Sequence, residues 1–226
     1  GCATTFNRGD RLMAVDEAEL AEQGRLARQS LLQDIPWNRE LWQGLVERYH
    51  GVGLPHASLL LGNEGTGKRP LAFRLAKFLL CQAPDKKESK STSYCNVCHS
   101  CKLIDAGSHP DYFICDQEAK GKQIKVDTIR SLNDFLSKTP QISACQVVQI
   151  YPVEAMNLNA SNALLKTLEE PPKHAIFILA TTEKHKIIPT ILSRCQIFDF
   201  KRITVKDAAN YLGYIAKEQG ITADED

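Results

Sequence analysis

Short, mainly apolar runs alternate along this sequence with stretches in which apolar residues return every three or four positions. The apolar runs are residues 57–61, 112–115, 146–150, 175–180 and 196–200. Helical spacing marks residues 37–49, 71–79, 126–136 and 159–170. The run at 175–180 has no polar residue, which suits a strand in a sheet that is covered on both faces. The pattern therefore predicts an α/β fold built on a parallel sheet.

The two ends of the sequence differ from this central pattern. Residues 1–35 contain one helical stretch, 15–32, which is either a helix docked on the core or part of a solvated, partly disordered extension that need not be native. Residues 36–200 hold the alternating elements and form one predicted domain. A new helical pattern begins at residue 201, but it ends at 226 and is too short to close a domain of its own.

Composition limits what the protein can bind. The 226 residues, 43% of them hydrophobic, can bury one core and part of a second. With 28 Lys and Arg against 27 Asp and Glu, the net charge of +1 gives no bulk attraction to nucleic acid or to an anionic membrane, so any DNA contact must be local or shared with partners. No apolar run spans a bilayer, and residues 1–9 lack the apolar region of a signal peptide. We therefore expect a soluble, cytoplasmic protein with no membrane partner.

A glycine-rich loop follows the first apolar run and leads into a helical stretch. Its candidate phosphate-binding residues are Gly62, Gly65, Thr66, Gly67, Lys68 and Arg69. Glycines let backbone N–H groups turn inward around a phosphate, and a Lys such as Lys68 reaches the outer phosphates of a nucleotide. The order of strand, loop and helix is the context that a P-loop requires. However, Arg69 stands where a P-loop carries the Ser or Thr hydroxyl that binds Mg²⁺.

The second half of a nucleotide site is also incomplete. After the run 146–150, an ATPase of this build carries an Asp that holds Mg²⁺ and a Glu that orients water, but Tyr151 and Pro152 stand there instead. Because both losses affect one metal-binding unit, the sequence predicts that hydrolysis has been abandoned. Glu154 is either a displaced catalytic acid or, as we favour, a solvated residue at a helix start. Thr182, after the fourth apolar run, either senses a γ-phosphate or caps the strand.

Four of the eight cysteines are clustered, at Cys81, Cys95, Cys98 and Cys101. Thiolates in Cys-x-x-Cys spacing can face one Zn²⁺ from a tight turn, and four thiolates complete a tetrahedral shell that leaves no position for substrate. We therefore expect a structural zinc knuckle over residues 81–101. The alternative is a set of buried or free thiols. His99 lies within the knuckle and is either a substitute ligand or, as we favour, a surface residue.

Three signatures together resemble the clamp-loader branch of the AAA+ proteins. They are the cysteine module after the P-loop helix, NALLKTLEEPP at 162–172, and ATT at 180–182 leading to SRC at 193–195. The resemblance covers residues 36–200 and implies a P-loop AAA+ (RecA-like) parallel sheet with an inserted zinc knuckle. It also implies that residues 201–226 are the truncated start of a helical lid domain, and that the protein is a subunit of the bacterial DNA polymerase III clamp loader.

The resemblance implies partners and one further site residue. The partners are gamma/tau and delta subunits in a hetero-pentamer and, through that complex, the sliding clamp and primer-template DNA. Arg194 matches the arginine of the Ser-Arg-Cys motif, which implies an arginine finger that stabilises γ-phosphate charge in a neighbouring subunit's site. From the residues alone, a surface ion pair is the alternative for Arg194.

Within that family the sequence lies between two branches. The gamma/tau subunits hydrolyse ATP with an intact P-loop and Asp-Glu pair, whereas delta-prime subunits commonly have both degraded. Arg69, Tyr151 and Pro152 therefore favour a delta-prime-like subunit that binds ATP or ADP weakly or not at all. The stretch 184–214 resembles gamma/tau, so a gamma/tau-type ATPase is the alternative. A third hypothesis, a nucleic-acid-binding finger made of the cysteines and the basic loop 120–125, is weaker because the recognition helix of the usual finger spacing is missing.

Overall fold

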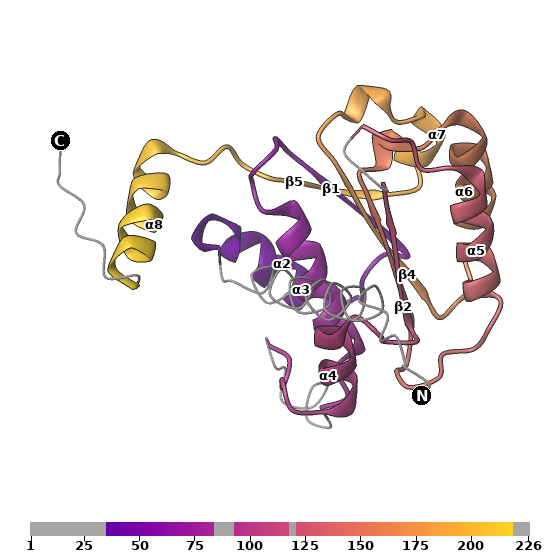
Figure 1. Ribbon diagram of the computed structural model, residues 1–226, viewed down its shortest axis with the longest axis horizontal. Coiled ribbons are helices and arrows are strands. Elements are labelled where there is room, and N and C mark those ends of the chain that lie inside the picture. Colours follow the sequence, from indigo (N-terminus) through magenta and orange to yellow (C-terminus); the bar gives the residue numbers. More distant parts are fainter. Residues whose placement is uncertain (1–34, 84–92, 118–120, 219–226) are drawn as a thin grey trace, which may run out of the picture.

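A five-stranded sheet forms the centre of the computed structural model, which describes residues 35–83, 93–117 and 121–218 (Figure 1). The strands are β1 (Ala57–Leu61), β2 (Tyr112–Asp116), β3 (Gln146–Tyr151), β4 (Ala175–Thr181) and β5 (Gln196–Asp199). Their order is β2-β3-β4-β1-β5, and every neighbouring pair is parallel. The predicted parallel sheet is confirmed. The ends of β1 and β4 lie side by side, with Leu61 paired to Thr181.

Helices cover both faces of the sheet (Figure 1). The α2 helix (Arg39–His50) and α3 (Lys68–Leu80) lie on one face, and α5 (Val126–Leu136) and α6 (Leu158–Glu169) lie on the other. The remaining helices are α4 (His99–Ala106), α7 (Pro189–Leu192) and α8 (Val205–Glu218), and α8 lies away from the sheet (Figure 1). Successive residues of one strand face opposite sides: Leu59 joins the cluster that contains α5 and α6, whereas Leu60 joins the cluster that contains α2 and α3. Because both faces are covered, the central strands need apolar residues at almost every position.

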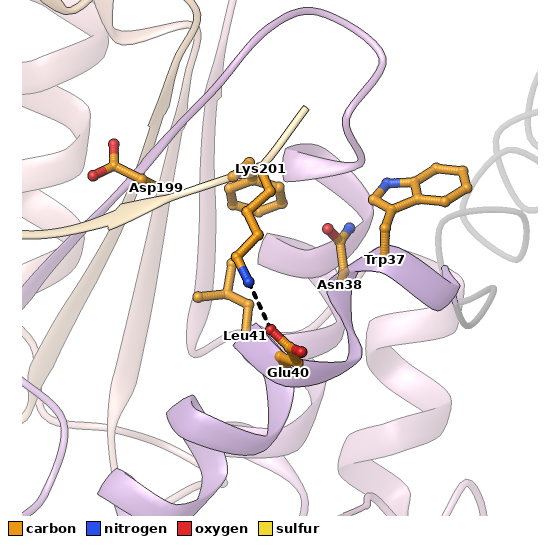
Figure 2. Close-up of a pocket in the computed structure, with 7 residues that line it drawn as sticks. Trp37, Asn38, Glu40, Leu41, Asp199 and Lys201 are labelled. Atoms are coloured by element: carbon orange, nitrogen blue, oxygen red, sulfur yellow. Dashed lines mark hydrogen bonds and ion pairs between the residues drawn. The ribbon is translucent and has the colours of Figure 1, made fainter. Parts of the chain in front are cut away.

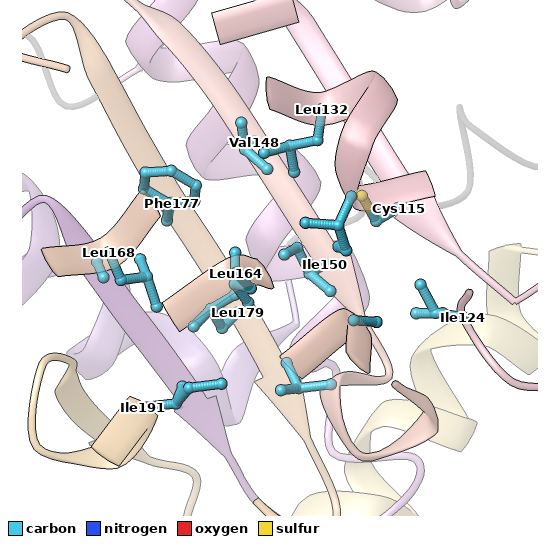
Figure 3. Close-up of a cluster of buried hydrophobic side chains, with 14 of the residues drawn as sticks. Cys115, Ile124, Leu132, Val148, Ile150, Leu164, Leu168, Phe177, Leu179 and Ile191 are labelled. Carbon is cyan, nitrogen blue, oxygen red and sulfur yellow. The ribbon is translucent and has the colours of Figure 1, made fainter. Parts of the chain in front are cut away.

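The α6 helix packs on the strands whose ends carry the candidate site (Figure 3). Leu164 of α6 lies in one fully buried cluster with Phe177 and Leu179 of β4. Burying each such side chain stabilises the fold by about 1.5–3 kcal/mol. The helix begins after Asn157, whose side chain accepts the N–H of Ala160 at 2.8 Å. Packing and capping together therefore fix α6 beside the ends of β3 and β4.

Two elements differ from the sequence prediction. The sequence pattern does not indicate α4, because this short helix begins inside the cysteine cluster at His99. Residues 187–192, around Pro189, also have a sequence typical of a helix, but only α7 forms there. It starts at Pro189, since proline has a backbone angle suited to the first helical turn and no N–H to pair further in. The helix predicted over 15–32 lies outside the described residues.

The last described element, α8, confirms the helical pattern, but it begins at Val205 and not at residue 201, where the pattern opens. Its Tyr211 meets Trp37 edge to face, with the ring centroids 5.3 Å apart. Whether this helix opens a lid domain stays a prediction. Of the helices within the described ranges, none is long and apolar enough to cross a membrane.

Candidate nucleotide site and cysteine cluster

The glycine loop runs from the end of β1 to the start of α3 at Lys68. Gly67 has a φ of 90°, which side chains disfavour. A Cβ on Gly67 would also lie 2.6 Å from Nδ2 of Asn38 and 2.7 Å from Cδ1 of Ile35. The segment from Ile35 to the 3₁₀ turn Pro36–Asn38 therefore crosses directly over the loop, and only glycine permits that approach.

Two side chains of this crossing segment hold the loop from outside. The indole N–H of Trp37 donates to the carbonyl oxygen of Thr66 at 3.0 Å, and the Asn38 amide donates to the same oxygen at 3.1 Å. Within the loop, the Thr66 hydroxyl donates to the carbonyl of Asn63 at 2.8 Å. The loop is thus fixed by groups of the protein itself.

Lys68 turns its amine into the same loop. Its Nζ donates to the carbonyl oxygens of Gly62 and Asn63, at 2.8 and 2.5 Å, and only 3% of the residue is exposed. Burial lowers the pKa of Lys68, while the charges of Glu154 and Glu64 oppose that shift. The amine that a P-loop offers to the outer phosphates therefore already has two acceptors.

Arg69 joins the ends of two strands. Its guanidinium pairs with Asp116, at the end of β2, at 2.5 Å. It also lies over the ring of Tyr151, at the end of β3, 5.6 Å from the ring centroid. A positive side chain thus stands among the strand ends where an ATPase has the hydroxyl and carboxylate groups that hold Mg²⁺. Asp116 directly follows an apolar run, but no motif in the sequence marks it as a site residue.

Glu154 corrects a prediction made from the sequence. It is not a solvated residue, because its Oε1 accepts the N–H and the hydroxyl of Thr182, at 3.0 and 2.8 Å. Its Oε2 is buried and has no hydrogen-bond partner within the described ranges. Burial alone raises the pKa of Glu154, but hydrogen bonds from Thr181 and Thr182 outweigh it, so the pKa lies below its usual value. Glu154 is therefore a charged carboxylate at neutral pH.

The structure therefore brings all the predicted nucleotide residues to one edge of the sheet, but it does not present them to a ligand. Lys68, Arg69 and Thr182 each bind a partner from the chain. The donor set also lacks the hydroxyl and the two acids that hold Mg²⁺ and orient water. As arranged, these residues do not fit a Mg²⁺–nucleoside triphosphate.

A groove of about 240 Å³ lies beside the loop (Figure 2). Its lining residues are Trp37, Asn38, Glu40, Leu41, Asp199, Phe200 and Lys201. Lys201 pairs with Glu40 across the groove at 2.9 Å, and its hydrogen bond lowers the pKa of Glu40. Both side chains are more than 80% exposed, at 82% and 84%, so the pair contributes little to stability.

The four predicted metal ligands converge in one cluster. The sulfur atoms of Cys81, Cys95, Cys98 and Cys101 all lie within 4.8 Å of one another. Zn–S bonds of about 2.3 Å in a tetrahedron place sulfur atoms about 3.8 Å apart, so the cluster fits Zn²⁺. His99 is not part of it and lies exposed at the first position of α4.

Backbone N–H groups support thiolates in this cluster. The N–H of Cys98 points to the sulfur of Cys95 at 3.3 Å, and the N–H of Cys101 points to the sulfur of Cys98 at 3.4 Å. Burial alone raises the pKa of Cys95, but the N–H groups of Cys98 and Val97 and the neighbouring thiols of Cys98 and Cys81 lower it to about 6. Burial raises the pKa of Cys81 and of Cys101. A cation in the cluster would favour the thiolate form of all four.

A buried Ser-His-Asp group beside the cluster is structural. Nδ1 of His109 accepts the N–H of Asp111 at 3.0 Å, so Nε2 carries the proton and donates to the Ser100 hydroxyl at 2.8 Å. That hydroxyl donates to the carbonyl of Leu80 at 2.6 Å. The Asp111 carboxylate accepts three backbone N–H groups from residues 141–143 instead of binding His109. His109 is therefore no base for Ser100, and the network ties α4 to the end of α3.

An ion pair between the buried Lys77 and the half-buried Asp105 makes a second connection between α3 and the cysteine module. Nζ of Lys77 lies 2.6 Å from Oδ1 of Asp105 in α4 and 4.8 Å from the ring centroid of Tyr94. The Lys77 side chain is 1% exposed, and a buried ammonium is tolerated only with such partners. The helix that begins at the glycine loop is therefore joined firmly to the cysteine module.

Arg194 follows α7, on the surface. Its guanidinium donates to the carbonyl of Thr190 and to Oε1 of Glu169, both at 2.8 Å. The surface ion pair considered from the sequence is therefore present, and it links the signature runs at 162–172 and 193–195. About a third of the Arg194 side chain, 34%, remains exposed.

Known proteins match most of this chain in sequence. A family model described as "DNA polymerase III, delta subunit" matches residues 37–204. The DNA polymerase III subunit delta' (delta-prime) of Pseudomonas aeruginosa is 43% identical over 160 residues, which cover 71% of this chain and 46% of that protein. The DNA polymerase III subunit tau of Bacillus subtilis is 37% identical over 201 residues, which cover 89% of this chain and 34% of that protein. The chain thus spans less than half the length of these relatives.

A solved structure matches the fold. The DNA polymerase III gamma subunit-related protein of Thermotoga maritima superposes with a TM-score of 0.54 at 23% identity, covering 77% of this chain and 52% of that chain. At this identity the likeness concerns the fold alone, and it confirms the predicted fold class.

Proposed function

Since this chain belongs to the DNA polymerase III delta-subunit family, we propose that it is a delta-prime-like subunit of the clamp loader. In that assembly it supports the ATP-driven loading of the sliding clamp onto primed DNA, beside gamma/tau and delta subunits, and does not hydrolyse ATP itself. The observation that carries this proposal is the internal pairing of Lys68, Arg69 and Thr182, each of which binds another group of the chain in place of a nucleotide.

Two observations favour delta-prime over gamma/tau. Tyr151 and Pro152 replace the two acids that hydrolysis requires, and Arg69 replaces the hydroxyl. The identity to the Pseudomonas delta-prime subunit, 43%, is also higher than the 37% to the Bacillus tau subunit. The tau match extends over more of the chain, 89%, so a gamma/tau-type ATPase remains the second candidate. Turnover that is lost in Lys68→Ala would favour that second candidate.

In the proposed assembly Arg194 acts as an arginine finger toward a neighbour's γ-phosphate. Its bonds to Thr190 and Glu169 already restrict the side chain, so less rotamer entropy is lost when it meets a phosphate. The guanidinium has five N–H donors, so it can donate further hydrogen bonds to a phosphate. The four clustered cysteines hold a structural Zn²⁺, which when bound crosslinks the end of α3 to the start of α4.

The test uses full-length subunits assembled with gamma and delta. We expect Arg194→Ala to lower the DNA-stimulated ATPase rate by at least about threefold, because a trans arginine supplies roughly 10³-fold or more at the site it serves. Arg130→Ala is the matched control, since Arg130 is also an exposed arginine in an ion pair, with Asp127 at 2.7 Å. An unchanged rate in a fully assembled Arg194→Ala complex would rule out the finger.

A further inference from the structure

Glu154 accepts hydrogen bonds from both donor groups of Thr182. Thr182 follows β4 and is the candidate γ-phosphate sensor, yet its N–H and hydroxyl both bind Oε1 of Glu154, at 3.0 and 2.8 Å. Glu154 comes from the 3₁₀ turn Val153–Ala155, directly beyond the end of β3. The contact therefore spans two neighbouring strands at the edge of the sheet that carries the glycine loop.

The charge of the Glu154 carboxylate also acts on residues at the glycine loop. Its charge acts on both Lys68 and Tyr151, which places all three in one site. Lys68 does not neutralise it directly, because the Lys68 amine binds the carbonyls of Gly62 and Asn63. A phosphate that entered this site would meet a negative charge that little water screens.

We propose that Glu154 is a specificity-determining residue of this nucleotide-type site: its carboxylate takes the place of a γ-phosphate at Thr182 and rejects nucleoside triphosphates. The inference rests on the proposed loss of ATP hydrolysis and adds a cause for it beyond the missing Mg²⁺ ligands. A γ-phosphate needs the same two donors that Oε1 occupies, and it carries the same sign of charge. A nucleoside diphosphate has no γ-phosphate to compete for Thr182, so Glu154 discriminates between the two.

Two substitutions separate charge from shape. Glu154→Gln keeps an oxygen that can accept both Thr182 donors and removes only the charge, so the local fold is retained. Glu154→Ala removes the acceptor as well. Glu47→Gln is the matched control, because it removes one negative charge from the exposed side of α2, outside the site. Circular dichroism melts confirm that each variant is folded.

The experiment is a calorimetric titration of the purified chain with ADP and with a nonhydrolysable ATP analogue. We expect both Glu154 variants to bind the triphosphate analogue at least about tenfold more tightly than wild type, the size of one weakly screened charge interaction. The affinity for ADP should change by less than about threefold, and Glu47→Gln should behave as wild type.

Three results would overturn the proposal. The first is that neither Glu154 variant binds the triphosphate analogue more tightly than wild type, or that no variant binds it detectably. The second is an equal increase in the affinity for ADP, and the third is a similar increase in affinity in Glu47→Gln. None of these results bears on the clamp-loader role, which the Arg194 assembly test addresses separately. Conversely, an inactive finger would leave the role of Glu154 intact.

Discussion

The glycine loop and the cysteine cluster both look like ligand sites in the sequence, but they differ in what their groups still need. At the loop, Lys68, Arg69 and Thr182 are each paired with another group of the chain. In the cluster, four sulfur atoms converge within 4.8 Å, an arrangement that a cation stabilises and that thiolates alone disfavour. A motif therefore predicts a ligand only where its groups remain available in the fold.

One helix connects the two sites. α3 begins with Lys68 in the glycine loop and ends next to Cys81, and its Lys77 binds Asp105 of the cysteine module. The glycine loop, whose side chains pair within the chain, and the cysteine cluster, which fits a metal, thus lie at opposite ends of one helix. Changes at the cysteine end should affect stability most, and changes at the loop end least.

Loss of the metal should have the largest effect. We expect the purified chain to contain about one Zn²⁺, and a chelator or Cys101→Ser to lower the free energy of unfolding by about 3 kcal/mol or more, because structural zinc binding is coupled to folding. Metal analysis and urea unfolding measure this. Cys145→Ser, a half-buried cysteine outside the cluster, is the control. A metal-free chain of unchanged stability would remove the difference between the two sites.

Breaking the ion pair of the buried Lys77 should have the next largest effect on stability. Asp105→Asn leaves the Lys77 ammonium, whose side chain is 1% exposed, without its carboxylate, and should cost about 2–4 kcal/mol of unfolding free energy. Asp134→Asn, at an exposed position of α5, should stay within about 0.5 kcal/mol. If both variants unfold at the same denaturant concentration, the cysteine module and α3 are not joined as described.

His109 should give the protein a pH-dependent stability. Burial lowers its pKa below the usual 6.5, so the unfolded chain takes up this proton first as the pH falls. The stability that neutral His109 contributes is fully present above about pH 6.5. It is lost as the pH falls from there toward the pKa of His109 in the folded protein, by at most about 1.4 kcal/mol per pH unit. His109→Gln should flatten the difference between unfolding at pH 7.5 and at pH 5.5. An identical difference in both proteins would contradict a neutral His109.

Restoring the P-loop motif should have the smallest effect on nucleotide binding and on stability. Arg69→Thr returns the missing hydroxyl, but Tyr151 and Pro152 still supply no acids, so no Mg²⁺-dependent nucleotide binding should appear. Stability should change by no more than about 1 kcal/mol, since the Arg69 side chain is 48% exposed in its pair with Asp116. Titration with and without Mg²⁺ measures the first effect. Mg²⁺-dependent binding by this variant would show that Arg69 alone had closed the site.

Much of the fold follows from local sequence. Strands such as β4 are apolar at almost every position because both faces of the sheet are covered, and α5 and α6 carry regular apolar stripes. The α4 helix could not be predicted in this way. It has only eight residues, and its first turn carries the ligand-type Cys101 in place of an apolar residue.

The two candidate sites also differ in how far local sequence predicts them. Cysteine spacing predicted the metal cluster, because most of its ligands lie within one turn of chain. The partners at the glycine loop come from far away: Asp116 is 47 positions from Arg69, and Glu154 is 28 positions from Thr182. Only the sheet order, with β2 next to β3 and β3 next to β4, brings those strand ends together. The position of Asp116 and Glu154 at or just after strand ends was the signal in the sequence that could have identified these partners.

Titration of the wild-type chain with a nonhydrolysable ATP analogue, with and without Mg²⁺, tests most directly whether the glycine loop has stopped serving as an ATPase site. We predict weak or absent binding that Mg²⁺ does not change. Tight binding that requires Mg²⁺, together with turnover that Lys68→Ala abolishes, would contradict this account and identify the chain as a gamma/tau-type ATPase.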